Sequence, residues 1–450
     1  MRKTFVLGVI FLYLHVTLMR VSFVSAEDEI MDEDSDRSPP RPHHVLGRSK
    51  RETNSFWGNL FNFERKPKPE RRISNETLNK MNEFSERNNR FLSLFTVVKF
   101  NNEACMSASG DNGTCFPQAE CVRRGGASNG KCAQGYGSCC VFSKSCGAST
   151  NQNCTYFTHN GYPSSFDGSG SCQLTVYKCA PDICQLKLEF DSFNIAQPGS
   201  NGVCNNDQFI VSGTTTAVPI TCGVNTGNHM FVDVGNDNSP VTLSVITSGP
   251  TFSRSWKIKV TQIKCNDAFR APEGCLQYFR GVSGVIRSYN FDFTSGQQLS
   301  NQDYTTCIRQ ERNFCGIRYT ACSDNVGYPS GGDPARSRAF TLTGQLAQGG
   351  AGSVGAITGS SNCVTDWVTI PCATNTGRIL QMNGAVCQDR LCGDIFNSEG
   401  GGASNQVPVY SYAKPFRITY HTDSNETNDS GNRGFCLNYI QQPCTPQQKK

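Results

Sequence analysis

The side chains best able to do chemistry in this sequence are its cysteines, of which there are 24 in 450 residues. All of them lie at or after Cys105. Free thiols at this density would react with one another, whereas an even number of closely spaced cysteines is typical of disulfide bridges formed in an oxidising compartment. The cysteines therefore predict a protein of the extracellular space or the secretory lumen, with its disulfide-bonded domains after residue 104.

Patterns that would support catalysis or zinc binding are missing from the sequence. The run Asn428-Asp429-Ser430-Gly431 resembles the nucleophile motif of trypsin-like proteases, but Ser430 completes a glycosylation sequon. None of the three histidines after residue 100 stands in the setting of a catalytic triad, and a His-Glu-x-x-His motif is absent. The first cysteines have neither Cys-x-x-Cys spacing nor a nearby histidine, which excludes a zinc site there. We therefore predict that the chain is not an enzyme.

The N-terminal hundred residues indicate a secretory route. Residues 1–26 have a basic start, an apolar stretch and a small-x-small cleavage pattern, so we predict a signal peptide cleaved after Ala26 rather than an uncleaved membrane anchor. Residues 27–51 are acidic and end in a basic run, which favours a propeptide cleaved after Arg51 over a charged loop. Residues 52–104 form a predicted linker, either partly disordered or containing one short amphipathic helix.

Five Asn-x-Ser/Thr sequons would be open to glycosylation on this route, and we expect them on surface loops. They are Asn75, Asn112, Asn153, Asn425 and Asn428. The net charge of +5 is small for a chain of this length, which together with the compartment argues against nucleic acid as a partner. No second long apolar stretch follows the signal peptide, so we expect no membrane span.

The cysteines fall into three groups with even numbers, so each group can close its own bridges. Residues 105–140 hold six, residues 146–265 hold eight and residues 275–444 hold ten. Spacing alone leaves the pairing open, because six cysteines already allow about 15 connectivities. The first group is too small for a real hydrophobic core and would depend on its bridges. Its order of cysteines, ending in the adjacent pair Cys139-Cys140, resembles the arthropod clip domain.

Alternating apolar and polar residues in the second group predict an all-β sandwich. The clearest runs lie at 186–190, 209–211, 230–232 and 241–245. The motifs that follow one another here are Gly161-Tyr162-Pro163, Leu188-x-Phe190-x-x-Phe193, Cys204-Asn205-Asn206-Asp207 and Cys222-Gly223. Their order resembles a CUB domain, a compact β-sandwich of extracellular proteins. The resemblance implies the bridges Cys146–Cys172 and Cys204–Cys222, and the additional cysteines could pair as Cys179–Cys184 and Cys154–Cys265.

The third group repeats these motifs with larger departures. They are Gly284-Val285-Ile286-x-Ser288, Cys363-Val364-Thr365-Asp366-Trp367, Leu391-Cys392-Gly393 and Gly434-Phe435-x-x-x-Tyr439. This half resembles a divergent CUB domain, which implies the bridges Cys275–Cys307 and Cys363–Cys392, with Cys372–Cys387 closing an inserted hairpin. A Gly/Ser-rich insertion between Tyr328 and Asn362 is predicted to be a loop. The expected fold is therefore all-β: tandem disulfide-stapled CUB-like β-sandwiches preceded by a small six-cysteine module.

Many CUB domains bind calcium through three carboxylates, so the resemblance also implies where a metal site would lie. In the second group only Asp207 occupies such a position, and we expect this half to be metal-free, with Asp207 accepting hydrogen bonds from backbone N–H groups. In the third group Asp366 and Asp423 match, but no glutamate precedes them at the expected place. We therefore favour structural hydrogen bonding over calcium ligation for this pair and expect no cofactor.

The favoured function is that of a secreted, non-enzymatic scaffold protein that binds an extracellular protein through its CUB-like modules. Stiff, disulfide-bonded sandwiches suit this role because their loops lose little entropy on binding. The alternative is a non-catalytic cofactor or regulator of an extracellular serine-protease cascade, since clip and CUB modules often accompany protease domains in arthropod proteins. A carbohydrate or lipid carrier ranks last, because the sequence offers no signature of an apolar pocket.

Overall fold

The computed structural model describes residues 98–324, 338–342, 355–377, 387–424, 426 and 431–444. Internal contacts divide the chain into Met1–Leu94 and Phe95–Lys450, and the described residues all belong to the second unit. Five predicted modification sites lie outside the described residues: the cleavage sites at Ala26 and Arg51 and the sequons Asn75, Asn425 and Asn428. So do most of the 52–104 linker and most of the Gly/Ser-rich insertion.

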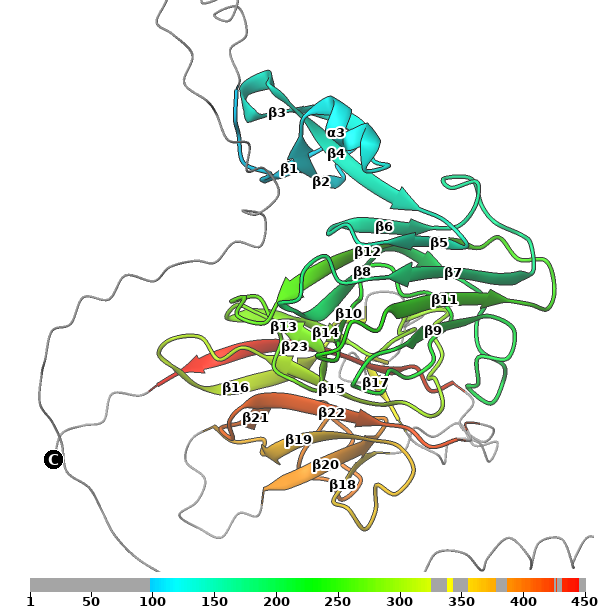
Figure 1. The fold of residues 1–450 in the computed structure, drawn as a ribbon. Coiled ribbons are helices and arrows are strands. Elements are labelled where there is room, and N and C mark those ends of the chain that lie inside the picture. The colour runs from blue at the N-terminus through cyan, green and yellow to red at the C-terminus, as the bar shows by residue number, and fades with distance from the viewer. Residues whose placement is uncertain are drawn as a thin grey trace, which may run out of the picture. The chain divides into compact units, whose positions relative to one another are not determined.

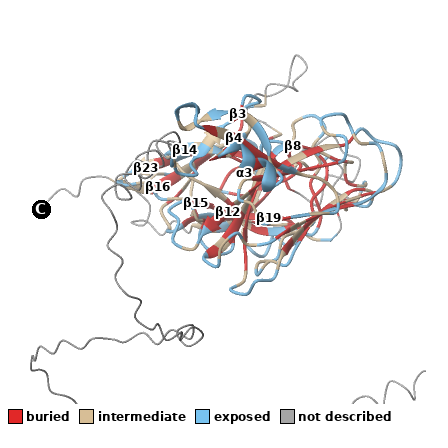
Figure 2. Cartoon of the chain, turned by 45° about the horizontal axis from the view of Figure 1, so that its top comes forward, coloured by how far each residue is buried: buried red, intermediate tan, exposed pale blue. Residues whose placement is uncertain are grey.

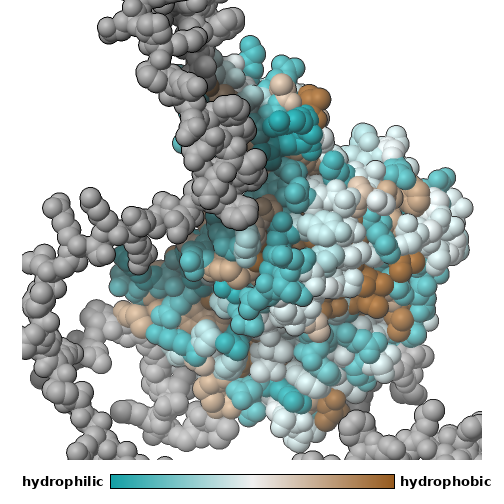
Figure 3. All heavy atoms as spheres, viewed as in Figure 1, coloured by the Kyte–Doolittle hydropathy of each residue, from teal (hydrophilic) through white to brown (hydrophobic). Residues whose placement is uncertain are grey.

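The described part of the chain is all-β, as its alternating sequence patterns predict (Figure 1). It contains 23 strands, one short α-helix, α3 (Gln118–Arg123), and one turn of 3-10 helix. Buried residues concentrate along the strands, and exposed residues along the loops and the helix (Figure 2). The face seen in Figure 3 is mostly hydrophilic or near neutral, with hydrophobic residues in separate spots.

The six-cysteine piece is held mainly by its bridges. Its strands are β1 (Ala104–Met106), β2 (Asn112–Phe116), β3 (Ala127–Cys132) and β4 (Gly137–Lys144). Three disulfides staple it: Cys105–Cys139, Cys115–Cys132 and Cys121–Cys140. Its buried apolar cluster consists of Phe116, Cys121, Cys140 and Phe142, so bridges supply the stability that so small a core cannot. Strand β4 also pairs with β6 (Thr155–Thr158), which extends a sheet of the next piece.

Residues 146–265 form the first sandwich, whose two sheets enclose apolar side chains. One sheet runs in the order β6, β12 (Ser255–Lys264), β8 (Ile183–Asn194), β10 (His229–Asp233), and the other in the order β5 (Ala148–Thr150), β7 (Gly170–Val176), β11 (Val241–Thr247), β9 (Gln208–Ser212). The predicted alternating runs lie in β8, β9, β10 and β11. In β8, Leu186 and Leu188 are buried whereas Lys187 and Glu189 are partly exposed, which is the period-two pattern of a strand with one buried face.

The second sandwich, residues 275–444, is larger and less regular. One sheet has the order β13 (Cys275–Phe279), β15 (Asp303–Ile308), β22 (Phe416–His421), β19 (Trp367–Ala373), β20 (Gln388–Gly393), β18 (Ala356–Thr358). The other has the order β14 (Ser283–Arg287), β23 (Gly434–Pro443), β16 (Phe314–Ala321), β21 (Val409–Ser411), with β17 (Phe340–Thr341) on β23. The adjacency of β19 and β22 matters most for function, because their loops meet at one end of the sheet.

Eight disulfides staple the two sandwiches within the described residues. They are Cys146–Cys172, Cys184–Cys265, Cys204–Cys222, Cys275–Cys307, Cys315–Cys444, Cys322–Cys436, Cys363–Cys392 and Cys372–Cys387. The four pairs that the resemblance implies as the framework are among them, as is the bridge of the inserted hairpin.

The pairs Cys179–Cys184 and Cys154–Cys265 are wrong, because Cys184 bonds to Cys265. Strands β8 and β12 are antiparallel neighbours with Ile183 opposite Lys264, which places the two cysteines beside each other with a Cα–Cα distance of 4.8 Å. Cys154 and Cys179 therefore remain as thiols, the first half-buried and the second exposed. Burial raises the pKa of both thiols, which makes them weaker nucleophiles at neutral pH.

The two sandwiches contact each other through polar as well as apolar groups. Their buried apolar residues belong to one continuous cluster. The Tyr289 hydroxyl donates to the carbonyl of His229 (3.0 Å), and the Tyr278 N–H donates to His229 Nε2 (3.1 Å). Burial lowers the pKa of His229 to about 4, with further lowering by Lys187 and an opposing effect of Glu189. The imidazole at this junction is therefore neutral at pH 7, with Nε2 as the acceptor.

Candidate functional site

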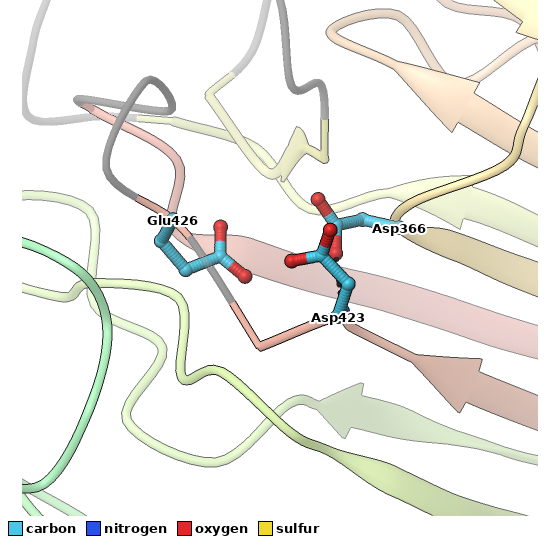
Figure 4. Close-up of side chains that lie close together, drawn as sticks. All are labelled: Asp366, Asp423 and Glu426. Atoms are coloured by element: carbon cyan, nitrogen blue, oxygen red, sulfur yellow. Dashed lines mark hydrogen bonds between the residues drawn. The ribbon is translucent and has the colours of Figure 1, made fainter. Parts of the chain in front are cut away.

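Three carboxylates converge at one end of the second sandwich (Figure 4). Asp366 immediately precedes β19, and Asp423 follows β22 by two residues. The loops that carry them meet because β19 and β22 are antiparallel neighbours, with Trp367 opposite His421. Glu426 adds a third carboxylate from the same loop as Asp423, and one oxygen of each group lies within 4.8 Å of the others. The fold thus brings together the two predicted aspartates and a glutamate that the sequence alone did not single out.

Hydrogen bonds hold two of the three carboxylates in place. Asp366 Oδ1 accepts from the backbone N–H of Asp423 (2.9 Å), and Glu426 Oε2 accepts from Gln298 Nε2 (3.0 Å). Asp366 and Glu426 are 1% and 2% exposed, whereas Asp423 is half-buried. The pKa of the adjacent Tyr420 hydroxyl is raised well above its usual range, mainly by burial and further by nearby Tyr304 and the cluster's carboxylates. The cluster is therefore a set of carboxylates in a largely dry environment.

Glu426 is positioned by the first sandwich as well as by its own. Its backbone N–H donates to the carbonyl of Asn201 (3.2 Å), which also accepts from the Ser300 hydroxyl (2.6 Å). The neighbouring Gly202 has φ +74°, and a Cβ at this position would lie 2.4 Å from Glu426 Cγ. Only glycine combines this backbone conformation with so close an approach. The 199–203 loop of the first sandwich therefore supports one corner of the carboxylate cluster.

An aromatic stack lies beside the cluster on the surface of the second sandwich. The rings of Trp367 and His421 are nearly parallel, with centroids 4.0 Å apart. The Arg390 guanidinium lies 3.9 Å from the Trp367 ring centroid. All three side chains are partly exposed, and they come from the neighbouring strands β19, β22 and β20. A partner that approached the carboxylates would also meet this stack.

The donor set suits calcium. Carboxylate oxygens are hard ligands, and with Ca²⁺–oxygen distances of about 2.3–2.6 Å two ligands of one ion lie up to about 5 Å apart. The oxygens of Asp366, Asp423 and Glu426 lie within 4.8 Å of one another, so they can reach one such ion. The sequence favoured hydrogen bonding for the two aspartates, and the bond between Asp423 and Asp366 is present. Glu426 makes calcium ligation more favourable than the two aspartates alone would, because it raises the number of converging carboxylates from two to three.

The first sandwich carries an ion pair at the corresponding place. Asp207 follows Cys204 by three residues, as Asp366 follows Cys363. Its carboxylate accepts from Arg254 Nε (2.6 Å) and Nη2 (3.0 Å), and both side chains are almost completely buried. The backbone N–H groups of Ala196 (2.7 Å) and Ser248 (3.1 Å) also donate to it. The predicted backbone hydrogen bonds are thus joined by a guanidinium that neutralises the carboxylate.

The three histidines that the sequence excludes from catalysis each pack against aromatic rings. His159 contacts Trp256 (centroids 5.0 Å apart), His229 contacts Phe279 (4.9 Å) and His421 stacks on Trp367. In each case the imidazole packs against an aromatic side chain.

In the part of the chain that the structure describes, no helix is both long and apolar enough to cross a membrane.

No sequence motif singles out Glu426. The expected position for an acid is before the third framework cysteine, and the stretch 338–362 before Cys363 contains none. The acid lies instead three residues after Asp423 and within the sequon that begins at Asn425.

Of the predicted glycosylation sites, two lie within the described residues, Asn112 and Asn153, and both are exposed.

Residues 272–442 match the family model of the animal CUB domain. A search of curated proteins finds no match. Similar solved structures include the CUB1-EGF-CUB2 domains of rat MASP-1, with 12% identity, 65% of this chain and 99% of that chain covered, and a TM-score of 0.22. The corresponding region of human MASP-1/3 has 15% identity, 64% and 98% coverage and a TM-score of 0.20. The full extracellular region of zebrafish Gpr126/Adgrg6 has 12% identity, 68% and 38% coverage and a TM-score of 0.23.

The family match covers the sandwich in which Asp366, Asp423 and Glu426 converge. CUB domains are non-catalytic, extracellular protein-interaction modules. The all-β, disulfide-rich structure of these residues agrees with the match. The match therefore supports a CUB domain at residues 272–442 of this chain.

Proposed function

We propose that this protein is a secreted, non-catalytic binding protein that recognises an extracellular protein through the carboxylate end of its second sandwich, in a calcium-dependent manner. The convergence of Asp366, Asp423 and Glu426 within 4.8 Å carries the proposal. In this role the three carboxylates hold one Ca²⁺ ion, which fixes the loops after β22 and before β19 in one arrangement. Three carboxylates and one divalent ion leave a single negative charge, which favours a basic group on the partner.

The route of the protein is part of this proposal. The eleven disulfides of the described residues require an oxidising compartment, and the N-terminal pattern supplies the signal that leads there. The signal peptide is cleaved after Ala26, and the acidic segment is removed after Arg51. The secreted form then carries the six-cysteine piece and both sandwiches.

The first sandwich serves as a second CUB-type module that needs no ion. Arg254 supplies a permanent positive charge to Asp207, which is the charge that calcium would supply to Asp366 in the other sandwich. The two sandwiches therefore differ in their response to chelators. Removal of calcium loosens the loop that bears Asp423 and Glu426 and leaves the loop that bears Arg254 unchanged.

Calcium titration of the full secreted chain tests the proposal. Isothermal titration calorimetry and a calcium-dependent rise in melting temperature should report one site. Glu426→Gln and Asp366→Asn should abolish both signals, because each removes a ligand from the ion. Glu399→Gln is the matched control, since Glu399 is an exposed acid of the same sandwich outside the cluster. Equal calcium affinity in Glu426→Gln and the parent chain would contradict the proposed site.

The support that the first sandwich gives to Glu426 is tested by a pair of glycine variants. Gly202→Ala should weaken calcium binding by about 10–100-fold, the usual effect of disturbing a group that orients a metal ligand. Gly227→Ala is the control, because Gly227 has a similar φ of +83° but no atom within 4 Å of the place where its Cβ would lie. Both variants strain the backbone of the first sandwich, so a loss of affinity in Gly202→Ala alone would report the close packing of Gly202 against Glu426, Ser300 and Gln298.

Partner binding is tested by affinity capture from extracellular fluid with the chain processed after Arg51. The relevant partner is retained in calcium, released by a chelator and not captured by Glu426→Gln. A partner captured equally by the parent and by Glu426→Gln would place recognition elsewhere on the molecule.

A further inference from the structure

A groove of about 760 Å³ lies where the outer face of the first sandwich meets the start of the second. Its volume is within the range of about 300–1,000 Å³ that ligand-binding pockets occupy. Strands β8, β10, β12 and β13 contribute to its walls. Its lining includes Asn153, Lys187, Lys259, Phe269, Tyr278 and Arg280.

Asn153 is one of the residues that line this groove. Its Oδ1 accepts from the backbone N–H groups of Cys154 and Gln262, both at 2.8 Å. Two N–H donors identify this atom as the oxygen and fix the orientation of the carboxamide. Within the described residues no hydrogen-bond partner contacts Nδ2. The side chain is exposed and begins the sequon Asn153-Cys154-Thr155.

The walls of the groove have the chemistry that binds sugar rings. Phe269 is 64% exposed, so its ring is accessible from solvent. The Arg280 guanidinium lies 4.1 Å from its centroid, which leaves N–H donors beside an apolar face. The Lys187 and Lys259 ammonium groups line the same groove, where each is ion-paired with Glu189 (2.7 and 3.0 Å). The C–H face of a pyranose packs on an aromatic ring, while its hydroxyl and acetamide oxygens accept hydrogen bonds from such cations.

We propose that Asn153 carries an N-linked glycan whose first sugars occupy this groove. The inference rests on the secretory route of the proposed function, but not on the calcium site. The donor is a lipid-linked oligosaccharide diphosphate of the secretory lumen. The bond from the sugar C1 to the phosphate oxygen breaks, a bond from C1 to Asn153 Nδ2 forms, the amide loses one proton, and the lipid diphosphate leaves.

The bond geometry of the folded protein is compatible with this modification. An N-glycosylated asparagine keeps its carbonyl, so both hydrogen bonds to Oδ1 persist. These bonds hold the carboxamide in one orientation, and the attached sugar leaves it at the nitrogen that faces away from them. The glycan then covers Phe269 and the adjoining contact between the two sandwiches.

The test uses the full chain secreted from animal cells. Peptide mapping by mass spectrometry should find glycans at both Asn153 and Asn112, the second exposed sequon, which does not line the groove. Under native conditions, peptide N-glycosidase should release the Asn153 glycan about tenfold more slowly than the Asn112 glycan, equivalent to about 1.4 kcal/mol of protection. After denaturation the two rates should be equal.

Two exposed apolar residues supply the variants. Phe269→Ala should speed release at Asn153, because the sugar loses its platform, whereas Val122→Ala should not, although Val122 is also 64% exposed. A secreted chain modified at Asn112 but not at Asn153 would overturn the inference and leave the proposed secretory route standing. Equal native release rates at the two sites, or a release rate unaffected by Phe269→Ala, would show that the glycan does not occupy the groove.

Discussion

Replacing Arg254 by methionine should destabilise the first sandwich strongly. Arg254 binds the Asp207 carboxylate through two nitrogens, and the side chains are 1% and 0% exposed. It also donates to the carbonyl of Ser248 at 2.9 Å and, more weakly, to that of Phe252 at 3.3 Å. Methionine fills similar space but leaves a buried carboxylate without its cation. The loss is therefore electrostatic and is not caused by a large cavity.

The magnitude follows from the burial of the pair. Removing one partner of a buried ion pair costs about 3–5 kcal/mol, because the remaining charge is left uncompensated. For a domain of this size each kcal/mol lowers the melting temperature by about 3–6 °C, so the expected decrease is roughly 9–30 °C. The backbone N–H groups of Ala196 and Ser248 still donate to Asp207, which favours the lower half of this range.

Differential scanning calorimetry of the full chain with its disulfides intact measures the effect. Lys264→Met is the matched control, because the Lys264–Asp182 ion pair of the same sandwich is 64% and 52% exposed and should contribute nothing measurable. The comparison is made without calcium, so that only the first sandwich is altered. If Arg254→Met melted at the same temperature as Lys264→Met, the guanidinium would not be the counter-ion that the buried carboxylate needs.

Three further outcomes are expected. The pKa of His229 is about 4 in the folded chain, against about 6.5 in the unfolded chain. The contribution of His229 to the free energy of unfolding is therefore fully present above pH 6.5 and decreases as the pH falls towards 4. His229→Gln should remove this pH dependence of the free energy of unfolding between pH 6.5 and 4. Thiol titration of the denatured chain should give two thiols, with exposed Cys179 alkylated before Cys154 under native conditions, and a count of zero or four would contradict the bridge assignment. Graded reduction followed by hydrogen exchange should unfold the six-cysteine piece first, since each bridge contributes about 2–4 kcal/mol and its core is the smallest; retention of that piece while both sandwiches melt would contradict this account.

Sequence patterns predicted the local and repeating features of this fold. The period-two runs identified β8 to β11; burial alternates along much of β8 and β9, whereas four consecutive residues of β10 are buried. The framework bridges were placed by resemblance, as in Cys204–Cys222, whose partners are 18 residues apart. The resemblance placed Asp366 by its distance of three residues from Cys363, and Asp423 by its position in a loop before the final strand.

Features that depend on contacts between distant segments were not predicted. Cys184–Cys265 joins residues 81 apart and follows from the pairing of β8 with β12, which the cysteine spacing does not contain. Arg254 contacts Asp207 although the two residues are 47 positions apart in the sequence, and no pattern near Asp207 indicates a cationic partner. The role of Glu426 depends on a contact with Asn201 in the other sandwich. Such residues become visible only when the chain is folded.

The dependence of Glu426 on Asn201 and Gly202 has a practical consequence for anyone who divides the molecule. A recombinant fragment that starts at residue 272 contains all three carboxylates, yet it lacks the backbone that holds one of them. Calorimetry on such a fragment would understate the calcium affinity that we propose for the intact protein. By the same reasoning, a protease that cuts the short connection between Cys265 and Cys275 would weaken the support that the first sandwich gives to Glu426, without altering any of the three carboxylates.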